Sequence, residues 1–153
     1  QRSEAEAMKW YQRAAIQGDA EAQLKIGDMY FEGQAVAQDY SAAARWYRFA
    51  ANNDSASAQY NLGILYAKGD GVPQDNILAH MWFNLAAVNF TSRLSRDRAI
   101  ALRDTIARKL SPAEIAKAQE MAGKWQTAGT RKLRAYPTSD PRDIKLIQSL
   151  AGP

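Results

Sequence analysis

The chain has 153 residues, of which 46% are hydrophobic and 24% charged, and its formal net charge is +4 at pH 7. This length suits one ordinary domain with a real core, and the composition is that of a globular rather than a disordered protein. With no cysteine and one histidine, His80, the sequence excludes disulfides, thiolate metal sites, cysteine nucleophiles and two-histidine metal sites. We therefore expect no resident metal and no cofactor.

The longest uncharged run, residues 76–92, contains His80 and three asparagines, which predicts an amphipathic helix rather than a membrane span. We therefore expect no transmembrane segment. Because the chain opens on Gln1 rather than on methionine, we also expect a fragment or a processed form, from which any signal peptide would be missing.

A period of 36 residues organises the first part of the chain. Trp10, Trp46 and Trp82 mark this period, and residues 19–54 are identical to residues 55–90 at 14 of 36 positions. In each copy, apolar or small residues at helical spacing flank a glycine-containing turn, which predicts a pair of antiparallel helices. The turns end at Asp39 and Asp75, which are expected to cap the second helices, and residues 5–18 have the pattern of a second helix from a further copy.

The residues that return at one period are most simply those that the fold requires. The three periodic tryptophans lie beside small alanines, which is typical of a core. Gly27 and Gly63 fall inside the predicted helices, where glycine costs about 1 kcal/mol relative to alanine, so we expect neighbouring helices to pass too close for a side chain. The first turn has Ala35 and Ala37 where the second has Gly71 and Pro73, and we expect it to be less constrained.

The period ends after residue 90. Residues 92–110 predict a long helix, and a capping box at Ser111 and Glu114, with Pro112 at the first helical position, starts another that runs to about Ala128. Because a repeat exposes apolar surface to its neighbour, residues 92–128 are expected to be the terminal cap of the array. Residues 129–153 form a basic tail with a short helix expected at 141–150.

These motifs resemble the Sel-one-like repeat (SLR) family, a branch of the tetratricopeptide superfamily. The residues from Ala58 to Ala87 show the family pattern A-x-x-x-L-G-x-x-Y-x-x-G-x-G-V-x-x-D-x-x-x-A-x-x-W-x-x-x-A-A, and residues 19–53 form a second copy. The resemblance implies an all-α fold, a right-handed α-solenoid of antiparallel helix pairs over residues 1–128. It also implies a bacterial adaptor or regulatory scaffold that binds other proteins, and it favours a periplasmic or exported location over a cytoplasmic one.

Positions that differ between the two copies on the first helix of each pair are candidates for specificity. In the tetratricopeptide architecture the first helices line a concave groove, so these positions are expected to bind a partner peptide or helix, with apolar anchors and polar orienting groups. The candidates are Leu24, Lys25, Asp28, Phe31, Tyr60, Asn61 and Ile64. The alternative for Leu24, Phe31 and Ile64 is ordinary packing between helices.

Charge is unevenly placed along the chain. Residues 1–90 carry 7 basic and 10 acidic residues, whereas residues 91–153 carry 13 and 6. The basic cap, with Arg96 and Arg103 on its long helix, could attract an acidic partner, so binding of a cell-wall glycan or an anionic surface is the alternative function. The other interpretation is a solvated face. No nucleic-acid-binding motif accompanies the charge, and we expect no nucleic-acid partner.

Enzymatic activity is not expected. His80 would have to carry any histidine-based triad, and it lies beside Ala79 on the second helix of a repeat, where a structural or surface histidine is the simpler interpretation. Some cysteine-rich members of the family have been discussed as binding or hydrolysing cell-wall compounds. This chain has none of their paired cysteines, so that activity is not carried over.

Overall fold

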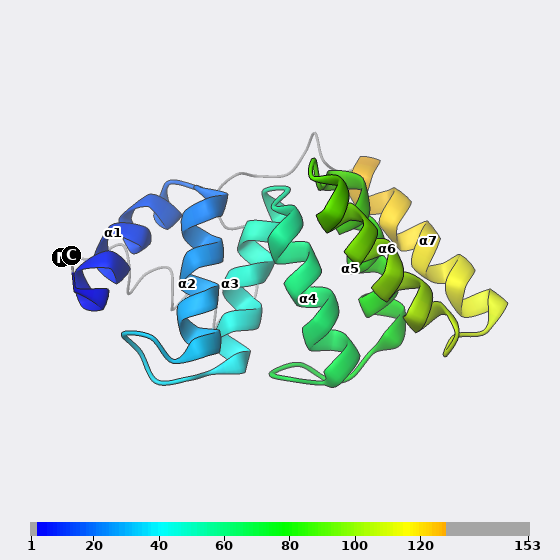
Figure 1. The fold of residues 1–153 in the computed structure, drawn as a ribbon, viewed down its shortest axis with the longest axis horizontal. Helices are drawn as coiled ribbons and strands as arrows, with labels where there is room; N and C mark the ends of the chain where they lie inside the picture. Colours follow the sequence, from blue (N-terminus) through cyan, green and yellow to red (C-terminus); the bar gives the residue numbers. More distant parts are fainter. Residues whose placement is uncertain (1–2, 128–153) are drawn as a thin grey trace.

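The computed structural model describes residues 3–127, which form seven α-helices arranged along an arc (Figure 1). The helices are α1 (Glu4–Ile16), α2 (Ala20–Glu32), α3 (Tyr40–Asn52), α4 (Ala56–Lys68), α5 (Asn76–Asn89), α6 (Arg93–Ala107) and α7 (Pro112–Thr127). From α1 to α6 each helix packs against the next, and α7 packs on α5. The predicted all-α fold of helix pairs is therefore confirmed. The helix expected at 141–150 lies outside the described residues.

The helices begin where side-chain caps place them. Asp39 and Asp75 each accept a hydrogen bond at 3.0 Å from a backbone N–H in the first turn of the following helix. At the start of α7, the Glu114 carboxylate accepts from the backbone N–H of Ser111 at 2.9 Å, and the Ser111 hydroxyl accepts from the backbone N–H of Glu114 at 3.2 Å. The predicted aspartate caps and the predicted capping box are thus confirmed.

The first turn keeps the backbone of the second turn despite its alanine. Ala35 has φ +63°, close to the +71° of Gly71 at the same position of the next repeat. A left-handed conformation is unfavourable for alanine, and the backbone N–H of Ala35 is held by a hydrogen bond to the Glu4 carboxylate at 3.1 Å. The two turns therefore share their backbone conformation at this position, and α1 supplies an acceptor to the first turn.

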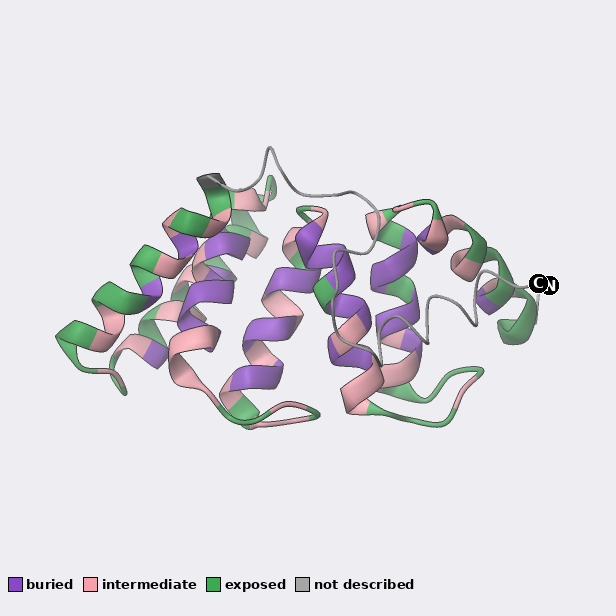
Figure 2. Cartoon of the chain, turned by 180° about the vertical axis from the view of Figure 1, so that it is seen from behind, coloured by how far each residue is buried: buried purple, intermediate pink, exposed green. Residues whose placement is uncertain are grey.

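Buried residues are concentrated in the middle helices of the arc, and α1 and α7 at its ends are more exposed (Figure 2). Trp46 is 1% exposed and Trp82 is 4% exposed, as core residues should be. Trp10, at the same repeat position, is 52% exposed, so its prediction as a core residue is wrong. The reason is that Trp46 lies in a cluster with Met8 of α1 and with residues of α2, whereas no helix within residues 3–127 precedes α1.

The end of the array is packed against the last repeat by an aromatic contact. The ring of Trp125 on α7 meets that of Trp82 on α5 edge to face, with ring centres 5.0 Å apart and ring planes at 72°. This contact accounts for a tryptophan that lies outside the 36-residue period. Within the described part of the chain, no helix combines the length and the apolar character that crossing a membrane would require.

Two buried glutamines tie successive repeats together. Gln23 and Gln59, one period apart, are both fully buried, and each donates to the backbone carbonyl eight residues earlier. Each also accepts a side-chain hydrogen bond from an asparagine 30 residues later, Asn53 at 3.1 Å and Asn89 at 2.9 Å. Because buried polar groups must be hydrogen-bonded, this repeated pair is a structural link between helix pairs and not a binding site.

Candidate functional site

A polar link joins α2, α3 and α4 at the middle of the predicted site. The Tyr47 hydroxyl on α3 donates to the Asp28 carboxylate on α2 at 2.8 Å, and the side chain of Asn61 on α4 lies beside this hydroxyl. Burial raises the pKa of Asp28 above its ordinary value, while the hydrogen bond from Tyr47 offsets part of the shift. Burial and the bond to Asp28 also raise the pKa of Tyr47. We call these three residues the polar link.

The polar link does not recur in the next repeat. One period later, the positions of Tyr47 and Asp28 are occupied by Phe83 and Ile64, so an apolar pair replaces the hydroxyl and the carboxylate. Sequence comparison of the two copies had pointed to the difference between Asp28 and Ile64. It did not point to Tyr47, because only the first helices were compared.

The replacement of both Asp28 and Tyr47 by apolar residues in the next repeat leads to a prediction about stability. Tyr47→Phe removes the donor to a half-buried carboxylate and should lower the free energy of unfolding by about 1–2 kcal/mol. Asp28→Ile should also destabilise the fold, whereas the double variant should lose less than the sum of the two, because it carries the pair found in the next repeat. Urea unfolding of the four proteins, followed by circular dichroism, measures this coupling, and strictly additive losses would contradict it.

A first hollow, of about 320 Å³, lies between α1 and α2. Its lining includes Glu4 and Tyr11 from α1 and Lys25, Asp28 and Glu32 from α2. Two of the predicted site residues, Lys25 and Asp28, are therefore brought together here. The neighbouring residues from α1 were not predicted, since nothing in the sequence of α1 alone indicates that it lies against this face of α2.

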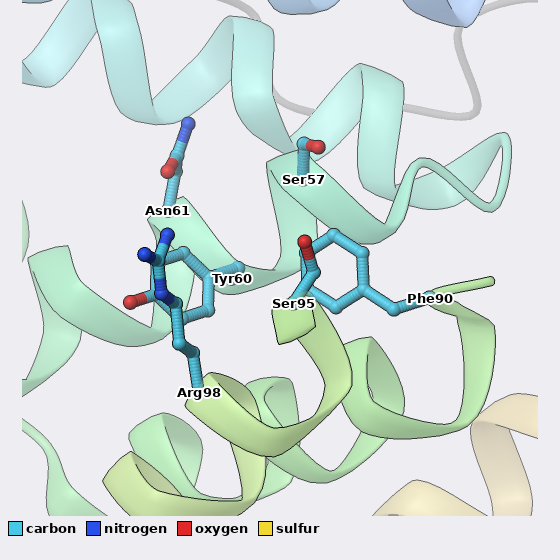
Figure 3. Close-up of a pocket in the computed structure, with 6 residues that line it drawn as sticks. All are labelled: Ser57, Tyr60, Asn61, Phe90, Ser95 and Arg98. Carbon is cyan, nitrogen blue, oxygen red and sulfur yellow. The ribbon is translucent and has the colours of Figure 1, made fainter. Parts of the chain in front are cut away.

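A second hollow, of about 190 Å³, lies between α4 and the start of α6. Tyr60 and Asn61 line it from α4, and Arg98 reaches it from α6 (Figure 3). Phe90, which ends α5, lies on the other side of the hollow, with its ring centre 6.1 Å from that of Tyr60. The lining is completed by Ser57 and Ser95.

The apolar residues of the predicted site divide between core and surface. Leu24 is 7% exposed and lies in the main core, so packing between helices accounts for its position. Phe31 is half-buried and its ring centre lies 5.1 Å from that of Tyr40. Ile64 is also half-buried against the core, so both residues combine a packing role with a partly accessible side chain.

The two arginines chosen from the cap have partners within the fold. Arg96 donates to the carbonyl of Phe90 at 3.2 Å and so closes the end of α5. Arg103 donates to Asn84 at 3.1 Å and to the carboxylate of Asp104 at 3.1 Å. Neither joins the two hollows, and both positions are explained by contacts between α5 and α6.

His80 is a core residue rather than a member of a site. Its side chain is 3% exposed, and burial together with the nearby charge of Arg103 lowers its pKa below the ordinary value. No group of three or more histidine, cysteine, aspartate or glutamate side chains suited to a metal ion occurs in the described part of the chain.

Comparison with known proteins identifies the fold family. The Sel1 repeat family matches the chain over residues 1–19, 20–55 and 56–87. A solved structure of a protective antigen from uropathogenic Escherichia coli strains, which displays an SLR fold, aligns with a TM-score of 0.73 at 29% identity, covering 89% of this chain and 30% of the antigen. A Sel1 repeat protein from Oxalobacter formigenes aligns with a TM-score of 0.53 at 40% identity, covering 54% of this chain and 63% of that protein.

A search of curated proteins gave no match. The chain spans about a third of the length of the Escherichia coli antigen and under two thirds of the Oxalobacter protein. The matched repeats begin within one residue of the copies expected at 19–54 and 55–90, and together they cover more than half of the chain. The periodic tryptophans and glycines, the helix pairs and this match lead to one conclusion: the chain belongs to the Sel1 repeat family.

Proposed function

We propose that the chain is a non-enzymatic interaction module that holds an extended peptide or a helix of a partner protein across α2 and α4. One observation carries the proposal: the polar link connects the linings of the two hollows, because the Tyr47 hydroxyl donates to Asp28 of the first and lies beside Asn61 of the second. We call the surface made by the two hollows and the polar link the groove.

Two further features support a binding role. Repeat domains of this kind typically mediate interactions, since their stacked helix pairs present an extended surface. The groove also mixes aromatic and polar side chains, Tyr60 with Asn61 in one hollow and Tyr11 with Asp28 in the other, which is the composition that peptide-binding surfaces use for anchoring and orientation.

The basic cap is the weaker candidate for a binding surface. Arg96 and Arg103 are engaged with α5, and Arg93 lies 4.0 Å from the carboxylate of Asp97. Each of these charges has a structural explanation, and none needs an external partner. Binding of a glycan or an anionic surface through the cap therefore lacks a specific observation among the described residues.

If a partner binds in the groove, a bulky charged side chain in the second hollow should abolish binding. Ser57 is exposed and lines the second hollow, so Ser57→Arg should place a long charged side chain in the hollow without disturbing the core. Gln119→Arg is the matched control, because it makes the same change in charge at an exposed position on α7. Affinity capture from an extract of the source organism, with proteins identified by mass spectrometry, should give proteins retained by the unchanged chain and by the control but lost from Ser57→Arg.

Equal capture by all three proteins would contradict the groove assignment. The free energy of unfolding of each variant should lie within about 0.5 kcal/mol of that of the unchanged chain, as is usual for surface substitutions, and urea unfolding measures it. Captured material that consists only of glycan or lipid, and that Ser57→Arg does not affect, would instead move the site to the basic part of the chain.

A further inference from the structure

The first hollow carries an excess of negative charge. Glu4, Asp28 and Glu32 are acidic members of its lining, and Lys25 is a basic one. The ammonium of Lys25 also lies 3.8 Å from the Glu21 carboxylate, so part of its charge is already balanced outside the hollow. A cationic side chain that entered this hollow would meet several carboxylates, and an anionic one would be repelled.

The second hollow has the opposite charge. Arg98 is the one charged residue among the described residues that line it. Asp97, its neighbour in sequence, is paired with Arg93, and Arg98 itself has no hydrogen bond or ion pair within residues 3–127. It lines this hollow together with Tyr60 and Asn61 (Figure 3). A carboxylate that entered here would find an arginine free to form a bidentate pair and an amide as a second donor.

The two hollows are close enough for one segment to enter both. Asp28 accepts a hydrogen bond from the Tyr47 hydroxyl, and Asn61 lies beside the same hydroxyl, so the ends of their side chains lie close together. Asp28 is part of the acidic hollow and Asn61 is part of the basic one. The change of sign therefore occurs between two hollows whose linings the polar link connects.

The size of the hollows suits side chains better than a whole small molecule. At about 320 and 190 Å³ they lie at or below the lower end of the range for small-molecule sites, which is roughly 300–1,000 Å³. The first lies between α1 and α2 and the second between α4 and α6, so a peptide that enters both runs from one helix pair to the next.

We propose that the groove recognises an extended segment of a partner protein that carries a lysine or arginine side chain in the first hollow and an aspartate or glutamate side chain in the second. This inference rests on the proposed function and adds the charge and the direction of the bound segment. The opposite signs of the two hollows fix the orientation, since a reversed segment would place like charges together at both ends.

The test uses a displayed library of random peptides of about twelve residues, which reach about 40 Å when extended. Selection on the full chain should enrich peptides with a basic residue toward one end and an acidic residue toward the other. Arg98→Glu should change the preferred residue at the acidic position to lysine or arginine and leave the basic position unchanged. The same variant should bind a peptide selected on the unchanged chain with about tenfold lower affinity, measured by fluorescence anisotropy.

Matched controls separate a site from a general effect of charge. Arg108→Glu makes the same change at an exposed position near the other end of α6 and should leave the selected motif and the affinity unchanged. For the other hollow, Glu32→Lys should change the preference at the basic position, and Glu120→Lys on α7 should not. Equal effects of a site variant and its control would overturn the proposal.

The outcome also distinguishes this inference from the proposed function. Selected peptides that lack a charge pattern, but whose binding is lost in Ser57→Arg, would overturn the charge assignment and leave the groove in place. Peptides that bind equally to the unchanged chain and to Ser57→Arg would overturn both.

Discussion

Trp46→Ala is expected to lower the free energy of unfolding by about 3–5 kcal/mol, the loss typical of a large aromatic side chain removed from a core. The side chain is 1% exposed and lies in a cluster with Met8, Ile26 and Phe49. Its ring meets that of Phe49 edge to face, with centres 5.4 Å apart. The loss therefore includes an aromatic pair as well as the buried area, and it spans contacts among α1, α2 and α3.

Trp10→Ala is the matched control, because Trp10 holds the same position in the repeat. Its side chain is 52% exposed, so the expected loss is about 1 kcal/mol or less. Urea unfolding followed by the circular dichroism of the helices measures both variants. Losses of similar size would contradict the assignment of Trp46 to the core and of Trp10 to the surface.

The contrast between these tryptophans shows what a repeated sequence can and cannot predict. Spacing and turn chemistry are local, so the helix pairs and the caps at Asp39 and Asp75 follow from the sequence. Burial depends on the neighbours of a helix. Trp10 and Trp46 have the same pattern around them, but only Trp46 has two helices packed on its N-terminal side.

The groove could be predicted in part for the same reason. Comparison of the two copies selected Asp28 and Asn61, which do line the two hollows. It could not select Tyr47 or Arg98. Tyr47 lies on the second helix of its pair. Arg98 reaches the groove only because the start of α6, which is outside the repeat, lies across the second hollow from α4. Such contacts between elements leave no periodic signal in the sequence.

Leu24 shows the opposite error, in which variation between copies does not indicate a surface. It differs from its counterpart Tyr60 one period later, yet it is buried in the core, whereas Tyr60 is half-exposed beside the second hollow. A larger aromatic residue at this position reaches past the core to the surface, and its ring packs against Phe83 and Phe90. Two residues at one repeat position can therefore differ in role because they differ in size.

Gly63→Ala should destabilise the protein, although alanine is the better helix former by about 1 kcal/mol. A Cβ atom at Gly63 would lie 2.6 Å from the Cδ1 and Cε1 atoms of the Phe83 ring, closer than real Cβ atoms come to their neighbours. Phe83 is 1% exposed and its ring packs against Tyr60, so it has little room to move. Overpacking of this kind costs about 1–3 kcal/mol, and we expect it to outweigh the gain in helix propensity.

Gly123→Ala isolates the helix-propensity term, because an added Cβ at Gly123 in α7 meets nothing within 4 Å. This variant should stabilise the protein by up to about 1 kcal/mol, so the two glycine variants should shift the urea midpoint in opposite directions. A stabilised Gly63→Ala would show that α4 and α5 can separate without cost, against the close contact seen here. Adding Phe83→Leu to Gly63→Ala should recover part of the loss, because a smaller side chain leaves space for the new methyl group, and this recovery would assign the cost to that one contact.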